Sequence, residues 1–286
     1  MASPAGAVRV AILGCGSMGT SLLQGFLRKR TTPVSLSLQL AACTRTQQSF
    51  DRLRATLGND SKAIDLGFGN HAKDMAESAD VIVLGCRKED LSAALNTVQP
   101  GRSYANKTIV SLMAGFSSAE LQQALTESGA PAETAIVRVI PSFAARTCTS
   151  VSLLASPAAV SQRRIDIVTQ IFEQVGSVLQ VDEDLLTKGV AIGSACHALA
   201  VTAVDSMTDA GVCEGIPRST AAALAAQFLR SAAGLMADGM SPEELKSALS
   251  TPKGITLNAV AELDRGGTRR AVIDAGRGAV KYAESM

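Results

Sequence analysis

Short apolar runs alternate with amphipathic stretches over roughly the first 180 residues of the chain. This alternation is typical of βαβ units that build a mostly parallel sheet. The apolar runs predict strands at residues 8–13, 38–43, 63–68, 81–86, 108–113, 135–140, 151–154 and 178–181. The amphipathic stretches predict helices at residues 17–30, 47–57, 71–78, 88–98, 117–128 and 158–175. Residues 31–37 are polar and contain a proline, and they are predicted to form a loop in the first crossover.

The pattern changes at Asp182, where strand-like runs end and long alanine-rich helical stretches begin. Helices are predicted at residues 183–211, 217–237, from 241 onwards, 255–265 and 267–284, with an interruption at 251–254. Pro217 suits the first turn of a helix, and Ser241 suits a cap because acidic residues follow it. We therefore predict an α/β fold in which a parallel-sheet domain at residues 1–181 precedes an all-helical domain at residues 182–286.

Composition and charge exclude several classes of function. The 286 residues are 47% hydrophobic and carry a formal net charge of +1. This is enough apolar material for one large or two ordinary domains. No basic stripe or aromatic ladder is present, so we expect a small-molecule ligand and neither a nucleic-acid nor a membrane partner. The longest uncharged apolar span, residues 189–204, is shorter than a bilayer requires and predicts a buried helix.

The cysteines and histidines indicate neither disulfides nor a metal site. The six cysteines lie far apart without a C-x-x-C pair, and we expect reduced thiols in the core. Residues 1–7 lack the features of a signal peptide, so we expect a cytoplasmic protein. Only His71 and His197 are present, and the pair Asp205 and Asp209 has no third ligand at a matching spacing. We therefore expect no bound metal.

The clearest chemical signal is the sequence G-C-G-S-M-G at residues 14–19, which follows the first predicted strand and opens the first predicted helix. In dinucleotide folds the first glycine permits a tight turn, the second lets backbone N–H groups approach a pyrophosphate, and the third lets the helix pack closely. The anion lies at the positive end of the helix dipole. The motif predicts a Rossmann-type dinucleotide-binding domain at residues 1–181, with cofactor contacts from Gly14, Gly16, Ser17, Met18 and Gly19.

The end of the second predicted strand bears on the choice between NAD and NADP. An acidic residue at this place binds the ribose hydroxyls of NAD, whereas an arginine accommodates the 2′-phosphate of NADP. The segment A-C-T-R-T at residues 42–46 contains no carboxylate. An arginine offers a bidentate contact to phosphate. We therefore predict a preference for NADPH, with Thr44 and Arg45 at the 2′-phosphate; the alternative is that Arg45 is a solvated loop residue.

Further segments, in the same order along the chain, resemble those of the pyrroline-5-carboxylate reductase family. They are DVIVLGCRK at 80–88, VSLMAG at 110–115, VRVIPS at 137–142, VDEDLL at 181–186, DAGVCEGIPR at 209–218, and residues 245–267 with TPKGIT at 251–256. The resemblance implies that Gly85, Cys86, Arg87 and Ala114 lie beside the cofactor. It also implies that residues 182–286 serve dimerisation and substrate binding, in a homodimer or a larger homo-oligomer. The residues themselves favour a dimer as well, because 189–204 are apolar on more than one face and too long to be covered by so small a domain, so we expect the alanine-rich helices of two subunits to pack together.

The same resemblance implies hydride transfer from NADPH to the C=N carbon of a cyclic imine carboxylate, such as 1-pyrroline-5-carboxylate, which yields proline. The cofactor supplies the hydride, and the protein supplies orientation and charge. The implied substrate-binding residues are Ser194, Thr251, Lys253, Gly254, Ile255 and Thr256, with Thr256 also expected at the catalytic position. Their hydroxyl and backbone N–H groups are expected to hold the substrate carboxylate.

Three positions depart from the family pattern. Lys253 replaces a glycine of the substrate loop, where a side chain disfavours positive φ. The helix segment GSACHA at 193–198 lacks the proline and tyrosine of the family pattern, and Ser142 replaces an asparagine. Two substrates therefore stay open. One is pyrroline-5-carboxylate itself, and the other, which these departures favour, is a substituted imine such as a methylated pyrroline carboxylate of specialised metabolism.

Two alternatives stay open from the sequence. One is a β-hydroxyacid dehydrogenase-like oxidoreductase, which pairs a similar N-terminal domain with a helical one and needs a lysine as proton donor; Lys188 is the candidate. The other is a non-catalytic NADP-binding protein, for which the altered loop at Lys253 and Ile255 is the reason.

Overall fold

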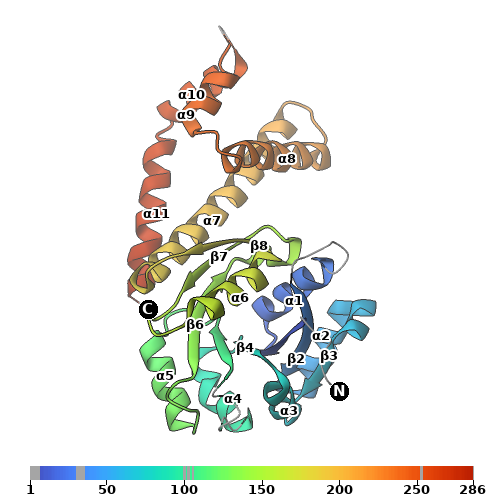
Figure 1. The fold of residues 1–286 in the computed structure, drawn as a ribbon. Coiled ribbons are helices and arrows are strands. Elements are labelled where there is room, and N and C mark those ends of the chain that lie inside the picture. The colour runs from blue at the N-terminus through green and yellow to red at the C-terminus, as the bar shows by residue number, and fades with distance from the viewer. Residues whose placement is uncertain are drawn as a thin grey trace. The chain divides into compact units, whose positions relative to one another are not determined.

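The computed structural model describes residues 7–29, 36–98, 101, 104, 106–251 and 254–285. The chain divides into two compact units, Met1–Thr187 and Lys188–Met286 (Figure 1). The first long helix, α7 (Glu183–Cys213), begins in the first unit and continues in the second.

The first unit is built on an eight-stranded sheet with the order β3-β2-β1-β4-β5-β6-β7-β8. Neighbouring strands are parallel except for the antiparallel pair β6 and β7. The strands are β1 (Ala7–Leu13), β2 (Ser37–Thr44), β3 (Asp65–Phe68), β4 (Val81–Leu84), β5 (Thr108–Ser111), β6 (Ala135–Pro141), β7 (Ser150–Ala155) and β8 (Gly176–Gln180). Every residue of β4 and β5 is buried, as expected for central parallel strands covered on both faces.

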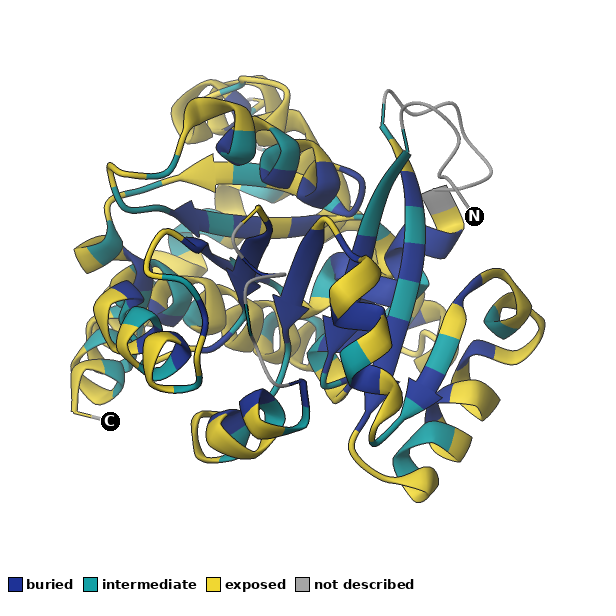
Figure 2. Ribbon diagram, turned by 60° about the horizontal axis from the view of Figure 1, so that its bottom comes forward, coloured by how far each residue is buried: buried dark blue, intermediate teal, exposed yellow. Residues whose placement is uncertain are grey.

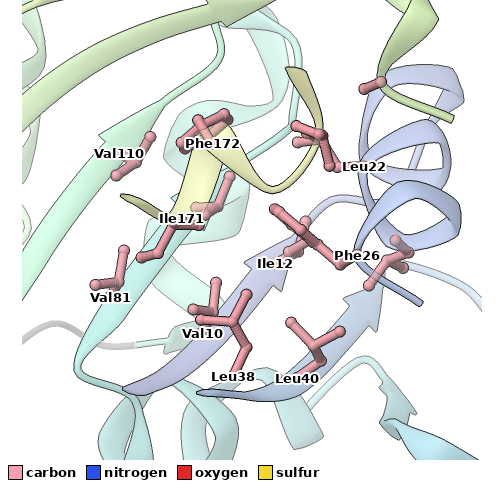
Figure 3. Packing of buried hydrophobic residues seen from close by; sticks show 14 of the residues in the cluster. Val10, Ile12, Leu22, Phe26, Leu38, Leu40, Val81, Val110, Ile171 and Phe172 are labelled. Atoms are coloured by element: carbon pink, nitrogen blue, oxygen red, sulfur yellow. The ribbon is translucent and has the colours of Figure 1, made fainter. Parts of the chain in front are cut away.

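Helices cover both faces of this sheet. One apolar core joins the sheet to α1 (Ser17–Lys29), α2 (Gln47–Leu57) and α6 (Gln162–Glu173). The other core joins it to α3 (His71–Ser78), α4 (Leu91–Val98) and α5 (Ser118–Glu127). In the first core, the rings of Phe26 and Phe172 pack edge to face at 6.5 Å between centroids (Figure 3). The central strands are accordingly buried in Figure 2.

The predicted α/β fold is confirmed, and all eight predicted strands form. The differences lie at element ends. Ala63, the first residue of the predicted third strand, instead ends a short 3-10 helix, η1 (Gly58–Ala63), and β3 begins at Asp65. Residues 88–90, predicted to open a helix, form another 3-10 helix, η2 (Lys88–Asp90), before α4. Strands β4 and β5 end two residues before the predicted limits, because the chain turns at their carboxyl ends. A third 3-10 helix, η4 (Phe143–Thr147), links β6 to β7.

The second unit is helical. It contains most of α7 together with α8 (Arg218–Ala237), α9 (Pro242–Leu249), α10 (Ile255–Arg265) and α11 (Thr268–Glu284). The end of α7 packs closely against the start of α8, because a Cβ on Gly211 would lie 2.9 Å from the Cβ of Ala221. Ser241 and Glu244 form the predicted cap of α9 by reciprocal hydrogen bonds.

Helix α7 is exposed over much of its length in the single chain. In the most apolar 18-residue stretch of α7, only 6% is buried among the described residues, and Val201 is 71% exposed. The prediction of a buried helix at residues 189–204 is therefore wrong for one isolated chain, because the other helices of the unit leave this apolar surface uncovered. By length and composition alone α7 also passes for a membrane span, but a single helix of this kind is weak support for one.

Candidate active site

The glycine motif lies where the order of the sheet reverses. Strands β2 and β3 extend the sheet on one side of β1, whereas β4 lies on its other side. In open α/β sheets, ligands bind outside the carboxyl ends of the strands at such a switch point. The turn after β1 is tied to both neighbours, because the Gly14 N–H donates to the Cys43 carbonyl at 2.9 Å and the Gly85 N–H donates to the Leu13 carbonyl at 2.8 Å.

Three glycines at this point are required by close backbone contacts. Gly14 has φ +93°, and a Cβ added to it would lie 2.8 Å from the Cys86 nitrogen. A Cβ on Gly85 would lie 2.4 Å from the Gly14 carbonyl oxygen, and one on Gly19 would lie 2.9 Å from the same oxygen. The turns after β1 and β4 and the start of α1 therefore touch through backbone atoms, where a side chain has no room.

Gly16 differs from the other glycines of the motif because it faces open space. A Cβ on Gly16 would meet no atom within 4 Å, and both Gly16 and Ser17 are exposed. The first turn of α1 contains no acidic residue. The first N–H groups of a helix have no partner within the helix and attract anions. The turn and the helix start thus present free backbone donors to a ligand.

A cavity of about 540 Å³ opens in front of this turn. Nine of the predicted cofactor residues line it: Gly14, Gly16, Ser17, Met18, Thr44, Arg45, Gly85, Cys86 and Arg87. Gly19 lies beneath the turn and does not line the cavity. Ala114 follows β5 in a separate loop and is also absent from the lining. The structure thus gathers nine of these positions around one cavity, while their contacts to a cofactor stay predictions.

A charge cluster lies in the same cavity. The Arg45 Nη1 lies 2.6 Å from Asp90 Oδ1, and the Arg87 Nε lies 3.2 Å from Asp90 Oδ2. The pKa of the Asp90 carboxyl is below its ordinary value, because hydrogen bonds and charge from the two arginines outweigh a desolvation that by itself raises it. Arg52 and Ser49 from α2 line the cavity as well. Sequence reasoning missed Asp90, which precedes α4 and is 45 positions from Arg45.

Three cysteines line the cavity but do not form a reactive thiol site. Burial raises the pKa of the Cys15 thiol to about 12, and burial also raises the pKa of the Cys43 and Cys86 thiols to about 11 each. A nucleophilic cysteine requires a thiolate, which these pKa values disfavour at neutral pH. The cysteines therefore act as small side chains that shape the cavity wall.

The loop after β5 is held from two sides. Lys88 reaches the Gly115 carbonyl at 3.5 Å and pairs with Glu120 at 3.4 Å. On the other side, the buried Arg138 donates to Glu183 Oε1 at 3.0 Å and to the Met113 carbonyl at 3.5 Å. The loop that contains Ala114 is therefore fixed by a lysine at the start of η2 and by an arginine of β6.

Glu183 completes the network around Arg138. Its Oε1 also accepts a hydrogen bond from the Ser118 N–H at 2.6 Å, at the start of α5. Partial desolvation by itself raises the pKa of Glu183. The hydrogen bonds with Ser118 and the Arg138 charge lower it by more, so the net shift of the pKa is downward. Glu183 thus joins the start of α5, strand β6 and the first turn of α7 within the first unit.

The predicted substrate residues lie in the second unit. Gly254 donates its N–H to the Thr251 carbonyl at 2.8 Å, and a Cβ on Gly254 would lie 2.5 Å from the Thr251 hydroxyl oxygen. Thr251 and Gly254 are therefore in close contact, and α10 begins directly after Gly254 with Ile255 and Thr256. Ile255 is 90% exposed and Thr256 is half-buried. Lys253 and Pro252 lie outside the described residues.

Other predicted positions are not brought to these residues within the described part of the chain. The Ser194 hydroxyl donates to the Val190 carbonyl of its own helix at 2.9 Å. His197 is exposed on α7, and Asp209 pairs with Arg218 at 2.6 Å. Lys188 lies 3.8 Å from Glu284, which gives the dehydrogenase alternative no further support. Among the described residues, no cluster of three or more metal-ligating side chains is present.

Ser142, which stands where the family pattern has an asparagine, does not line the cavity. The Ser142 hydroxyl instead interacts with the neighbouring strand, at 3.3 Å from the Ser150 hydroxyl and 3.3 Å from the Val151 N–H. In this structure the residue supports the connection between β6 and β7.

Comparisons with known proteins agree with this arrangement. The family described as "Pyrroline-5-carboxylate reductase dimerisation" matches residues 183–286, and the family described as "NADP oxidoreductase coenzyme F420-dependent" matches residues 9–115. A pyrroline-5-carboxylate reductase of Schizosaccharomyces pombe is 27% identical, over 96% of this chain and 98% of that protein. One from Neurospora crassa is 28% identical, over 97% of this chain and 92% of that protein.

A solved structure has the same fold. It is the Plasmodium falciparum pyrroline carboxylate reductase with NADP bound, and it matches with a TM-score of 0.75 and 20% sequence identity, covering 97% of each chain. Similarity to these proteins therefore extends over both units of the chain.

Proposed function

We propose that the chain is a member of the pyrroline-5-carboxylate reductase family, whose dimerisation model matches residues 183–286, and that it reduces the C=N bond of a cyclic imine carboxylate with NADPH. The observation that carries this proposal is the glycine-lined cavity at the switch point of the sheet, in a chain whose helical part matches the dimerisation family. Pyrroline-5-carboxylate, which is reduced to proline, is the first substrate to test.

The cavity fits a phosphorylated nicotinamide cofactor. The exposed Gly16 leaves space for a pyrophosphate beside the free N–H groups of α1, and Arg45 lies at the end of β2, where a 2′-phosphate is expected. When bound, the cofactor supplies the hydride for the reduction. The protein's own contribution is to hold the phosphates with backbone donors and arginines, and to shape the cavity wall with Met18 and Cys86.

The segment at residues 251–256 is proposed to bind the substrate carboxylate. The Thr251 hydroxyl and the N–H groups that open α10 are donors, and the first turn of α10 contains no acidic residue that would repel an anion. Thr256 follows in the first turn and is the proposed catalytic position. Holding the carboxylate in this way would orient the C=N carbon, and orientation is a large part of such catalysis.

The substrate itself is proposed to be pyrroline-5-carboxylate or a substituted relative of it. The departures at Lys253 and around Ser194 support the substituted imine, because they change the size and charge of positions that the family uses near its substrate. Comparing the unsubstituted imine with methylated pyrroline carboxylates decides between the two.

Purified protein is expected to oxidise NADPH when mixed with at least one pyrroline carboxylate, and to form the saturated ring. We expect kcat/KM to be about tenfold or more higher with NADPH than with NADH, because only the former carries the phosphate that arginine binds. The measurement is loss of absorbance of the reduced cofactor, with product identified by mass spectrometry. Absence of turnover with every pyrroline carboxylate contradicts the proposed function, and a preference for NADH contradicts the cofactor assignment.

The match of residues 183–286 to a dimerisation family supports homo-oligomerisation, and we propose a homodimer or a multiple of it. The exposed apolar side chains of α7, with Val201 71% exposed, are the proposed contact surface. Light scattering after size exclusion is expected to give at least twice the monomer mass, and Val201→Lys is expected to shift it towards the monomer. Thr56→Lys, on the exposed face of α2 in the first unit, is the matched control. A wild-type monomer at micromolar concentration would refute the proposal.

A further inference from the structure

A carboxylate lies beside Arg45 in the cavity, although the end of β2 contains none. Asp90 enters from the segment after β4, and its two oxygens contact different arginines: Arg45 at 2.6 Å and Arg87 at 3.2 Å. These two arginines come from different strand ends, after β2 and β4 respectively. All three side chains line the same cavity. The cluster therefore assembles at the place that separates NADP from NAD in such folds.

Stabilising the local fold does not by itself explain this arrangement. An acidic residue close to the start of α4 is favourable for the helix dipole, and Glu89 occupies the preceding position. Among the described residues, ion pairs with arginines are present for Asp90 and not for Glu89. Its side chain is 27% exposed, whereas those of Arg45 and Arg87 are 69% and 77% exposed. The carboxylate is thus the more buried centre of the cluster, and two solvent-exposed guanidinium groups pair with it.

A 2′-phosphate and Asp90 would compete for the same donors. Arginine binds phosphate and carboxylate through the same fork of N–H groups. A phosphate that takes over these groups leaves the Asp90 charge without partners and close to a second anion. With NADH, in contrast, no phosphate competes for the arginines, so both ion pairs stay in place and Asp90 keeps its partners.

We propose that Asp90 is a specificity-determining residue that competes with the cofactor's 2′-phosphate for Arg45 and Arg87 and so limits the preference for NADPH over NADH. This inference rests on the proposed function, because it takes the cavity to be the cofactor site. It identifies Arg87 as a second phosphate-binding arginine and Asp90 as the group that sets how strongly the phosphate is preferred.

The test measures fragment affinities by calorimetry with the full chain, so that it does not depend on turnover. The two probes are adenosine 2′,5′-bisphosphate and adenosine 5′-monophosphate, which differ by the 2′-phosphate alone. In Asp90→Asn, the ratio of their affinities is expected to rise about three- to tenfold in favour of the bisphosphate, as removal of one nearby charge in water-exposed surroundings predicts. Glu89→Gln removes the same charge one position away and is expected to leave the ratio within about twofold of the wild type.

Further variants keep the test decisive. Asp90→Ser, which retains a residue suited to a helix start, carries the same expectation if Asp90→Asn does not fold. Asp90→Glu retains the charge and is expected to stay close to the wild-type ratio. Arg87→Gln is expected to weaken the bisphosphate selectively, because it removes one of the proposed phosphate ligands.

The outcomes separate the inference from its premise. If both fragments bind and the ratio in Asp90→Asn is unchanged or lower, Asp90 does not compete with the phosphate, and the inference is overturned while the cofactor site stands. If neither fragment binds the wild-type protein at millimolar concentration, the cavity is not an adenine-nucleotide site, and the proposed function fails together with the inference.

Discussion

Replacing Gly14 by alanine is expected to abolish cofactor binding and to lower the free energy of unfolding by about 3 kcal/mol. The new Cβ would lie 2.8 Å from the Cys86 nitrogen, and the residue would have to keep φ +93°. Backbone atoms cannot move aside as a flexible side chain can, so the turns after β1 and β4 would have to separate. Chemical denaturation and calorimetric titration with NADPH measure the two effects.

Gly16→Ala is the matched control, because it adds the same methyl group two positions along the motif. Its Cβ would meet no atom within 4 Å, so the free energy of unfolding is expected to change by less than about 1 kcal/mol. The methyl group would project into the space proposed for the pyrophosphate, and NADPH affinity is expected to fall about tenfold or more. If Gly16→Ala binds NADPH as tightly as the wild type, the pyrophosphate does not lie at this turn.

The second large effect is expected at Glu183. Glu183→Gln leaves the Arg138 guanidinium, whose side chain is 6% exposed, without its charged partner. Breaking a buried pair from one side costs about 3–5 kcal/mol, and we expect about 2 kcal/mol here because the Glu183 side chain is 38% exposed and partly screened. Glu173→Gln, on the exposed face of α6, is the control and is expected to have little effect.

The same pair predicts a dependence on pH. The folded-state pKa of Glu183 is below its ordinary value of 4.5, so its contribution to stability is complete above pH 4.5 and is lost as the pH falls through the folded-state pKa. The stability difference between wild type and Glu183→Gln is therefore expected at pH 6 and should shrink progressively below pH 4.5. A difference that grows on acidification would show that the pair does not stabilise the folded state.

Arg138→Met tests whether the two side chains act together. In a double-mutant cycle, the combined variant is expected to lose less stability than the sum of the two single variants, because once Arg138 is absent no buried charge remains to be paired. Strict additivity would mean that Glu183 acts through the Ser118 N–H alone.

The sequence by itself determined the order and type of the elements, because strand and helix patterns are local properties of the chain. It also located the phosphate-binding turn, since the glycines at 14, 16 and 19 follow a buried strand and open a helix. The structure adds the reason for two of them: backbone contacts leave no room for a Cβ at Gly14 or Gly19. Even Gly85, identified by resemblance, turns out to face the Gly14 carbonyl.

Only the tertiary structure decided which distant side chains meet. Asp90 reaches Arg45 because β1 brings the ends of β2 and β4 to the same edge of the sheet, and no local pattern encodes a pair 45 residues apart. The same holds for Glu183, which meets Arg138 and the start of α5 across long stretches of chain. For α7, the sequence predicted an apolar helix at residues 189–204 with more apolar surface than its own small domain can cover. Only the structure shows that its own chain leaves most of this surface exposed, because an apolar helix has the same sequence pattern whether its own chain or a second copy covers it.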